Sequence, residues 1–141
     1  MILEFFFWDH FQNVVARMAE GEEGLISFRD AEVQLGDMAH HEQVGQLLLM
    51  KSNVRQELVE AVQSHHTVEE GSSELTCLLY LVNNLVKDLG LGYLPEEKGM
   101  YSEPLLSGLN ISLDDIQQLK EKLTEEVVPQ IQHVVELCLS S

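Results

Sequence analysis

The chain has 141 residues, of which 45% are hydrophobic and 23% are charged. This balance argues against a disordered chain, and the length suits one domain with its own core, over residues 1–141. Asp and Glu total 24 against 8 Lys and Arg, which gives a formal net charge of −16 at pH 7. Because so acidic a surface repels phosphates, we expect no nucleic-acid partner and no binding to anionic membranes.

Cysteine usage and the chain start bear on the compartment. Cys77 and Cys138 both lie in apolar runs, where we expect buried free thiols and not a disulfide framework. No run reaches the ~18 apolar residues of a membrane span, and the start lacks a signal peptide. We therefore expect an intracellular protein of the cytoplasm or nucleus. Because the chain opens on Phe5, Phe6 and Trp8, we also expect it to be a piece of a longer protein.

Helical periodicity dominates the first half of the chain. Apolar residues recur at steps of three and four over residues 3–18, which predicts an amphipathic helix. A capping-box pattern at residues 27–30 begins a short second helix. The longest pattern spans residues 38–64 and predicts one long helix. Gly45 lies inside it and, if the helix breaks, marks the expected place.

The second half predicts a central helix, a loop and a terminal helix. The central helix spans residues 72–89, and its narrow polar strip predicts burial nearly all round. Residues 90–111 carry Gly and Pro at many positions, which predicts a long internal loop with one helical turn near its end. A second capping box at residues 112–115 begins the last helix, which should kink or restart at Pro129.

No segment alternates with period two, so we predict an all-α fold: a single domain of five or six helices in an irregular bundle. The leucine spacing of residues 47–62 and 78–86 resembles the helix pairs of armadillo and HEAT repeats. That resemblance implies an alternative fold, a short armadillo/HEAT-like helical stack. It also implies that Asn83 or Asn84 grips the backbone of an extended peptide.

Motifs for catalysis and cofactors are missing. The stretch after His41 lacks the second histidine of a zinc protease, and no phosphate-binding glycine motif or nucleophile elbow occurs. The pairs His40-His41 and His65-His66 are the best metal candidates. Because they mark the two ends of the helix predicted over residues 38–64, we expect them to lie too far apart to share an ion. We predict no metal, no cofactor and no enzyme activity.

Three features are candidates for binding: the polar strip of the central helix, the apolar side chains of the 90–111 loop, and the aromatic cluster at the start. Each has a structural alternative, respectively internal hydrogen bonds, a lid over the core, and core packing. The candidate partner-binding residues are Tyr80, Asn83, Asn84, Lys87, Tyr93, Leu94, Met100, Tyr101, Leu105 and Leu106. The candidate dimer or domain contacts are Phe5, Phe6 and Trp8.

These features lead us to expect a non-catalytic helical interaction module of an intracellular adaptor or scaffold. Its partner would present a basic or amphipathic segment, attracted by the acidic surface. One alternative is a self-associating bundle that dimerises through its first helix. An alternative from another class is a helical domain that binds a small molecule or a metal.

Overall fold

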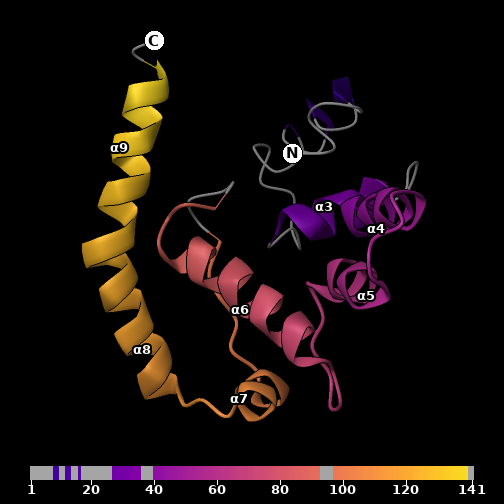
Figure 1. Cartoon of the computed structure of the whole chain (residues 1–141). Coiled ribbons are helices and arrows are strands. Elements are labelled where there is room, and N and C mark those ends of the chain that lie inside the picture. Colours follow the sequence, from indigo (N-terminus) through magenta and orange to yellow (C-terminus); the bar gives the residue numbers. More distant parts are fainter. Residues whose placement is uncertain are drawn as a thin grey trace.

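The computed structural model describes residues 8–9, 12–13, 16, 27–35, 40–92 and 97–139. In these ranges the chain is all-α, as predicted, and contains no strand. The helix expected over residues 3–18 falls largely outside them. The elements in chain order are α3 (Phe28–Leu35), α4 (His41–Lys51), α5 (Gln56–Ser64), α6 (Glu74–Asp88), α7 (Glu103–Leu109), α8 (Leu113–Lys122), the π-helical segment η1 (Leu123–Val127) and α9 (Val128–Leu139) (Figure 1).

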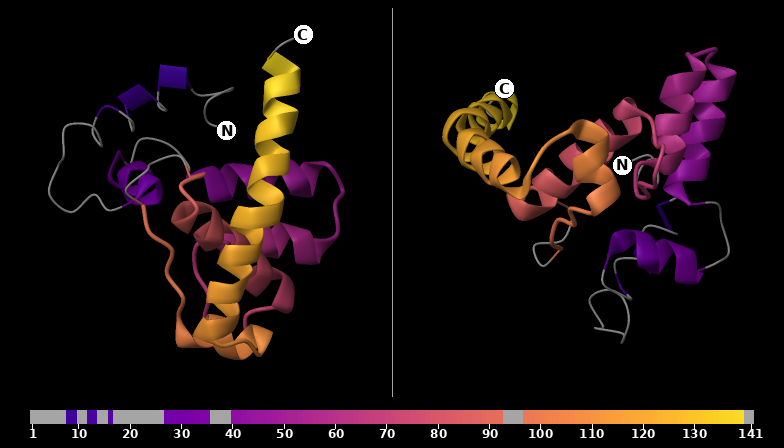
Figure 2. Two further views of the ribbon diagram at one scale, coloured as in Figure 1. Left: turned by 90° about the vertical axis from the view of Figure 1, so that its left-hand side faces the viewer. Right: turned by 90° about the horizontal axis from the view of Figure 1, so that it is seen from below.

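The helices form a small bundle around α6, which is the predicted central helix. On one side α4 packs against α5, and α5 packs against α6, while α7 packs against another part of α6 (Figure 1). On the other side α8, η1 and α9 follow one another as a single rod. Figure 2 shows that the C-terminal part of this rod extends beyond helices α4 to α7.

Serine caps place three helix starts where the sequence predicts them. Ser27 accepts a hydrogen bond from the backbone amide three residues later at the start of α3, and Ser73 does the same for α6. Ser112 forms both bonds of a capping box at α8. Each cap satisfies an amide that the first helical turn leaves unbonded, and so fixes where the helix begins.

The long helix predicted over residues 38–64 is wrong, because the chain turns back and forms the α4–α5 hairpin. The turn contains Asn53 in the left-handed region, with φ of 57°, a conformation that asparagine tolerates better than most residues. Gly45 does not break α4. A Cβ at Gly45 would lie 2.9 Å from Cγ1 of Val62, so the glycine lets the two antiparallel helices approach closely.

The core lies between α6, α7 and α8. Its buried residues come from three elements and are Cys77, Tyr80, Leu81 and Leu85 of α6, Leu105 of α7 and Ile116 of α8. Leu78 and Val82 of α6 are 43% and 53% exposed. The central helix is therefore buried along one face and not nearly all round as its composition predicts.

The segment after residue 96 folds back along α6 before α7 begins. Gly99 donates its backbone N–H to Oδ1 of Asp88 at 2.7 Å, and Met100 donates its N–H to Oδ1 of Asn84 at 2.8 Å. A Cβ at Gly99 would lie 2.6 Å from the carbonyl oxygen of Asn84, so only glycine fits here. The predicted helical turn near the end of the loop is present as α7.

The structure does not show the kink or new start expected at Pro129: the helix continues from α8 to α9, and only its hydrogen-bond register changes just before the proline. The five residues of η1 form a π-helical segment, and α9 begins one residue before the proline. Proline cannot donate a backbone N–H and crowds the carbonyl four residues earlier, so a local change of register accommodates it. All of α9 after its first residue is exposed, including Cys138. The expected burial of that thiol is wrong, while Cys77 is buried and free as predicted.

Candidate functional site

The α4–α5 hairpin brings together three of the four paired histidines. His41 begins α4, and His65 and His66 directly follow α5. The Nε2 atom of His41 lies 3.2 Å from Nε2 of His65 and 2.8 Å from Nε2 of His66. The expected separation of the two pairs is therefore wrong, because it assumed one continuous helix. The neighbouring His40 lies outside this histidine cluster, with Nδ1 3.8 Å from Glu42.

A second contact holds each ring of the histidine cluster at its other nitrogen. Nδ1 of His41 pairs with the carboxylate of Glu32 on α3. Nδ1 of His65 bonds to the backbone carbonyl three residues earlier at 2.6 Å. Nδ1 of His66 lies 3.3 Å from the side-chain amide nitrogen of Asn83 on α6. Contacts from α3, α5 and α6 therefore hold the three rings.

Burial dominates the electrostatics of the cluster. It lowers the pKa of His66 to about 2, with the neighbouring His65 and His41 adding to the effect. Burial also lowers the pKa of His65, although its backbone hydrogen bond opposes the shift. Both rings are therefore neutral at pH 7 and keep one nitrogen lone pair each. Glu32 is fully buried, and among the described residues its Oε1 has no hydrogen-bond partner.

Sequence reasoning missed the cluster for an identifiable reason. The apolar spacing of residues 38–64 fits one helix as well as two, so periodicity alone did not reveal the turn. The pair Ser52-Asn53 was the available signal, since both residue types favour turns. Nothing in the sequence pointed to Glu32, which is one acidic residue in a short amphipathic helix.

The predicted binding strip on α6 is used largely for internal contacts. Tyr80 and Asn84 are buried, and Asn84 donates to the carbonyl of Tyr80 while accepting from the returning segment. Asn83 holds His66, and Nζ of Lys87 lies 3.7 Å from the buried Glu97. In this conformation Asn84 is not available to grip a peptide as the armadillo resemblance implies.

The predicted loop residues divide into buried and exposed groups. Leu105 is completely buried and Leu106 is half-buried, whereas Met100 is 64% exposed. The hydroxyl of Tyr101 donates to Oδ2 of Asp88 at 2.8 Å. Burial and this hydrogen bond raise the pKa of that hydroxyl. The described part of the loop thus lies mainly as a lid over α6.

Several candidate residues cannot be placed at a surface. Tyr93, Leu94, Phe5 and Phe6 lie outside the described residues. Trp8 is described and is 51% exposed.

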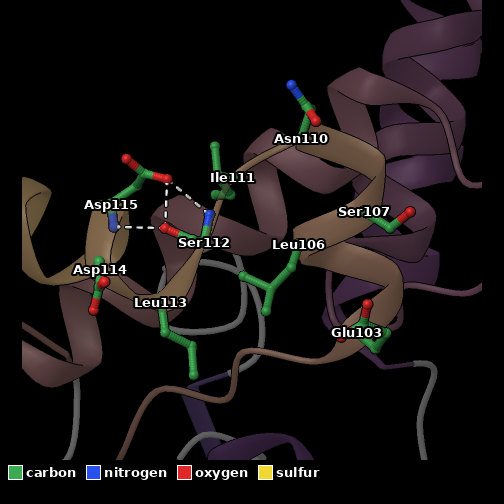
Figure 3. Close-up of a pocket in the computed structure, with 9 residues that line it drawn as sticks. All are labelled: Glu103, Leu106, Ser107, Asn110, Ile111, Ser112, Leu113, Asp114 and Asp115. Carbon is green, nitrogen blue, oxygen red and sulfur yellow. Dashed lines mark hydrogen bonds between the residues drawn. The ribbon is translucent and has the colours of Figure 1, made fainter.

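A shallow open pocket lies between α7 and the start of α8 (Figure 3). Glu103, Asp114 and Asp115 line it together with leucine and serine side chains, and no basic residue does. Oδ2 of Asp115 already accepts hydrogen bonds from the amide and hydroxyl of Ser112. Within this pocket the Ser112–Asp115 pair forms the cap of α8, and its acidic lining with no basic residue does not favour an anion.

One face of α9 carries a row of exposed apolar side chains. Ile131, Val134 and Val135 are 46%, 57% and 49% exposed, and Leu139 is 83% exposed. Steps of three and four bring the first three to one side of the helix together with Cys138. Among the described elements, α9 packs substantially only against η1, its own continuation. We call this set the α9 face.

Comparison of the chain with protein-family models, with curated proteins and with solved structures finds no match. Among the described helices, none combines the length and the apolar character that crossing a lipid bilayer requires. We therefore infer function from the geometry of the histidine cluster and of the α9 face.

Proposed function

We propose that the protein is a non-catalytic helical interaction module that binds an amphipathic segment of a partner protein on the α9 face. The observation that supports this most is the exposure of Ile131, Val134 and Val135 along one side of a projecting helix. Apolar side chains in a continuous row lose free energy when another surface removes them from water. An amphipathic helix meets such a row through anchors at the same spacing.

The charge around the α9 face favours a partner with basic residues beside its apolar anchors. Residues 123–139 contain three glutamates and no lysine or arginine. Glu125 and Glu126 lie in η1, and Glu136 lies in α9. Basic residues flanking the partner's apolar stripe would meet these carboxylates and accelerate association, while apolar contact supplies most of the affinity.

The same charge disfavours self-association as the main function. Two copies that each carry a net charge of −16 repel one another, and two α9 faces would bring like charges together. A different protein with a basic segment relieves both problems. We place this module within an intracellular adaptor or scaffold, where such helical contacts hold assemblies together.

The test compares partner binding by the wild-type protein with two matched variants. Val135→Asp puts a charge into the α9 face, and His133→Asp puts the same charge on the opposite side of α9. We expect the first to abolish binding of a partner recovered by affinity purification and the second to change its affinity less than threefold. Association with that partner should slow as salt rises, while dissociation should change little.

Three results would contradict the proposal. They are equal binding by both variants, association that ignores salt, or measurable affinity for duplex nucleic acid at physiological ionic strength. Native mass spectrometry of the purified protein adds a fourth measurement. A stable homodimer that Val135→Asp dissociates would show that a second copy, and not another protein, covers the α9 face.

A further inference from the structure

We propose that His41, His65 and His66 form a binding site for a divalent transition metal ion, with zinc as the preferred ion. Their nitrogens converge within 4.8 Å of one another. Imidazole nitrogen is a common ligand of zinc, copper and nickel, and three histidines are a sufficient protein ligand set when water takes the fourth position. This site is independent of the α9 face.

The hydrogen bonds at the outer nitrogens decide where the ring protons lie. A backbone carbonyl can only accept, so the bond to Val62 O places the proton of neutral His65 on Nδ1. The carboxylate of Glu32 likewise holds a proton on Nδ1 of His41. When both rings are neutral, Nε2 of His41 and Nε2 of His65 are then both unprotonated, and their lone pairs face each other across 3.2 Å.

Two facing lone pairs repel, and hydrogen bonds within the cluster remove only part of that repulsion. His66 can donate one proton from Nε2, which satisfies His41 at 2.8 Å but leaves His65 without a donor in the cluster. A cation at the centre accepts lone pairs from both rings at once. Rotating the side-chain amide of Asn83 by 180° puts its oxygen against Nδ1 of His66, so the third ring can ligate in the same way.

The distances fit an ion of the size of zinc. Tetrahedral zinc binds imidazole nitrogen at about 2.0–2.1 Å, which separates neighbouring ligand nitrogens by roughly 3.3 Å. The observed separations from Nε2 of His41 are 3.2 Å to His65 and 2.8 Å to His66. The His41–His66 separation would have to widen by about half an ångström to match this spacing. The three rings are partly exposed, so water can reach the fourth position.

The surroundings match the outer shell that metal-binding histidines require. Ligating histidines usually give their other N–H to a carboxylate, a backbone carbonyl or water, which orients the ring. Here Glu32 and the carbonyl of Val62 accept from His41 and His65, and the side-chain oxygen of Asn83 would accept from His66 once its amide is rotated. Glu32 is also fully buried, and a divalent cation bound through His41 would bring positive charge close to its side chain.

Bound zinc would join four segments that are distant in the sequence. His41 begins α4, and His65 and His66 lie between α5 and α6. Their outer-shell partners Glu32 and Asn83 come from α3 and α6. The ion would therefore close the α4–α5 hairpin and fix it to α3 and α6, which is a structural role.

The test uses purified protein freed of metal with a chelator and then titrated with zinc alone, followed by isothermal calorimetry. We expect one zinc ion per chain. Cobalt as a substitute should give the visible absorption bands of a tetrahedral ion, and X-ray absorption of the zinc form should show nitrogen and oxygen ligands without sulfur.

Variants locate the ion. His41→Ala and His66→Ala should weaken binding by at least about 100-fold, and Glu32→Gln by about 10–100-fold. His40→Ala is the matched control, since it removes the adjacent histidine outside the cluster, and should change affinity less than threefold. Far-UV circular dichroism checks that each variant folds.

Two results would overturn the proposal. One is the absence of stoichiometric zinc binding by the wild-type protein, which needs no variant to interpret. The other is zinc binding that His41→Ala and His66→Ala leave intact, which would locate the ion at carboxylates on the acidic surface.

Discussion

Helices α6 and α9 show that apolar content and burial are separate properties. By mean hydropathy α9 is the more apolar of the two. Yet α6 contributes Tyr80, Leu81 and Leu85 to the core, whereas α9 contributes no buried residue. The sequence pattern specifies a helix and its apolar face, but tertiary contacts decide whether that face is covered within the chain. An uncovered face as apolar as that of α9 is the place to look for contact with another molecule.

The largest expected effect is on the free energy of unfolding, which a buried charge in α6 should lower far more than the same charge on α9. Leu81→Asp puts a charge into the core and should lower the free energy of unfolding by about 4 kcal/mol or more. Val135→Asp makes a similar change on the exposed α9 face and should alter it by less than about 0.5 kcal/mol. Urea denaturation followed by circular dichroism measures both. Equal effects would show that α9 is buried in solution or that α6 is not the core helix.

Prediction from the sequence was accurate where a local signal settled the structure. Serine caps placed three helix starts. It was wrong where the presence or absence of long-range contacts determined the structure. Examples are the α4–α5 turn and the exposure of Cys138 on α9. The histidine cluster belongs to the second kind, because it exists only when His41 meets a pair 24 residues away. Apolar periodicity does not indicate which residues distant in the sequence come into contact.

The ion pair between Asp88 and Lys120 connects the rod to α6, and it should make stability depend on acid pH. Burial alone would raise the pKa of Asp88, but hydrogen bonds from Lys120, the Gly99 amide and the Tyr101 hydroxyl together lower it. A carboxyl group with a lowered pKa in the folded state stabilises the fold above its unfolded pKa, about 3.9. That stabilisation is lost as the pH falls through the folded value.

Asp88→Asn should therefore cost about 1–3 kcal/mol at pH 7 and progressively less below about pH 4. Chemical denaturation of both proteins across that range measures the difference. Glu121→Gln, on an exposed site of the same rod, is the control and should show no such convergence. A constant difference at all pH values would mean that the charge of Asp88 does not hold the rod in place.

Gly45→Ala tests the close contact inside the α4–α5 hairpin. Alanine favours a helix by about 1 kcal/mol over glycine, but the added Cβ meets Val62 and overpacking costs about 1–3 kcal/mol. We expect a net loss of about 1 kcal/mol, measured by thermal denaturation, which Val62→Ala in the same chain should reduce. Gln130→Ala on exposed α9 should be neutral or slightly stabilising. Net stabilisation by Gly45→Ala would show that the hairpin packs more loosely.

Pro129→Ala should have the smallest effect, because it acts on the exposed rod. Alanine restores a backbone donor and removes the clash with the carbonyl of Glu125, so the π-helical segment can return to α-helical hydrogen bonding. These local gains are offset by the greater freedom of alanine in the unfolded chain, and stability should change by less than about 0.5 kcal/mol. Amide hydrogen exchange over residues 123–133 should nevertheless slow. A loss above about 1.5 kcal/mol would instead show that the register set by Pro129 matters to packing beyond the rod.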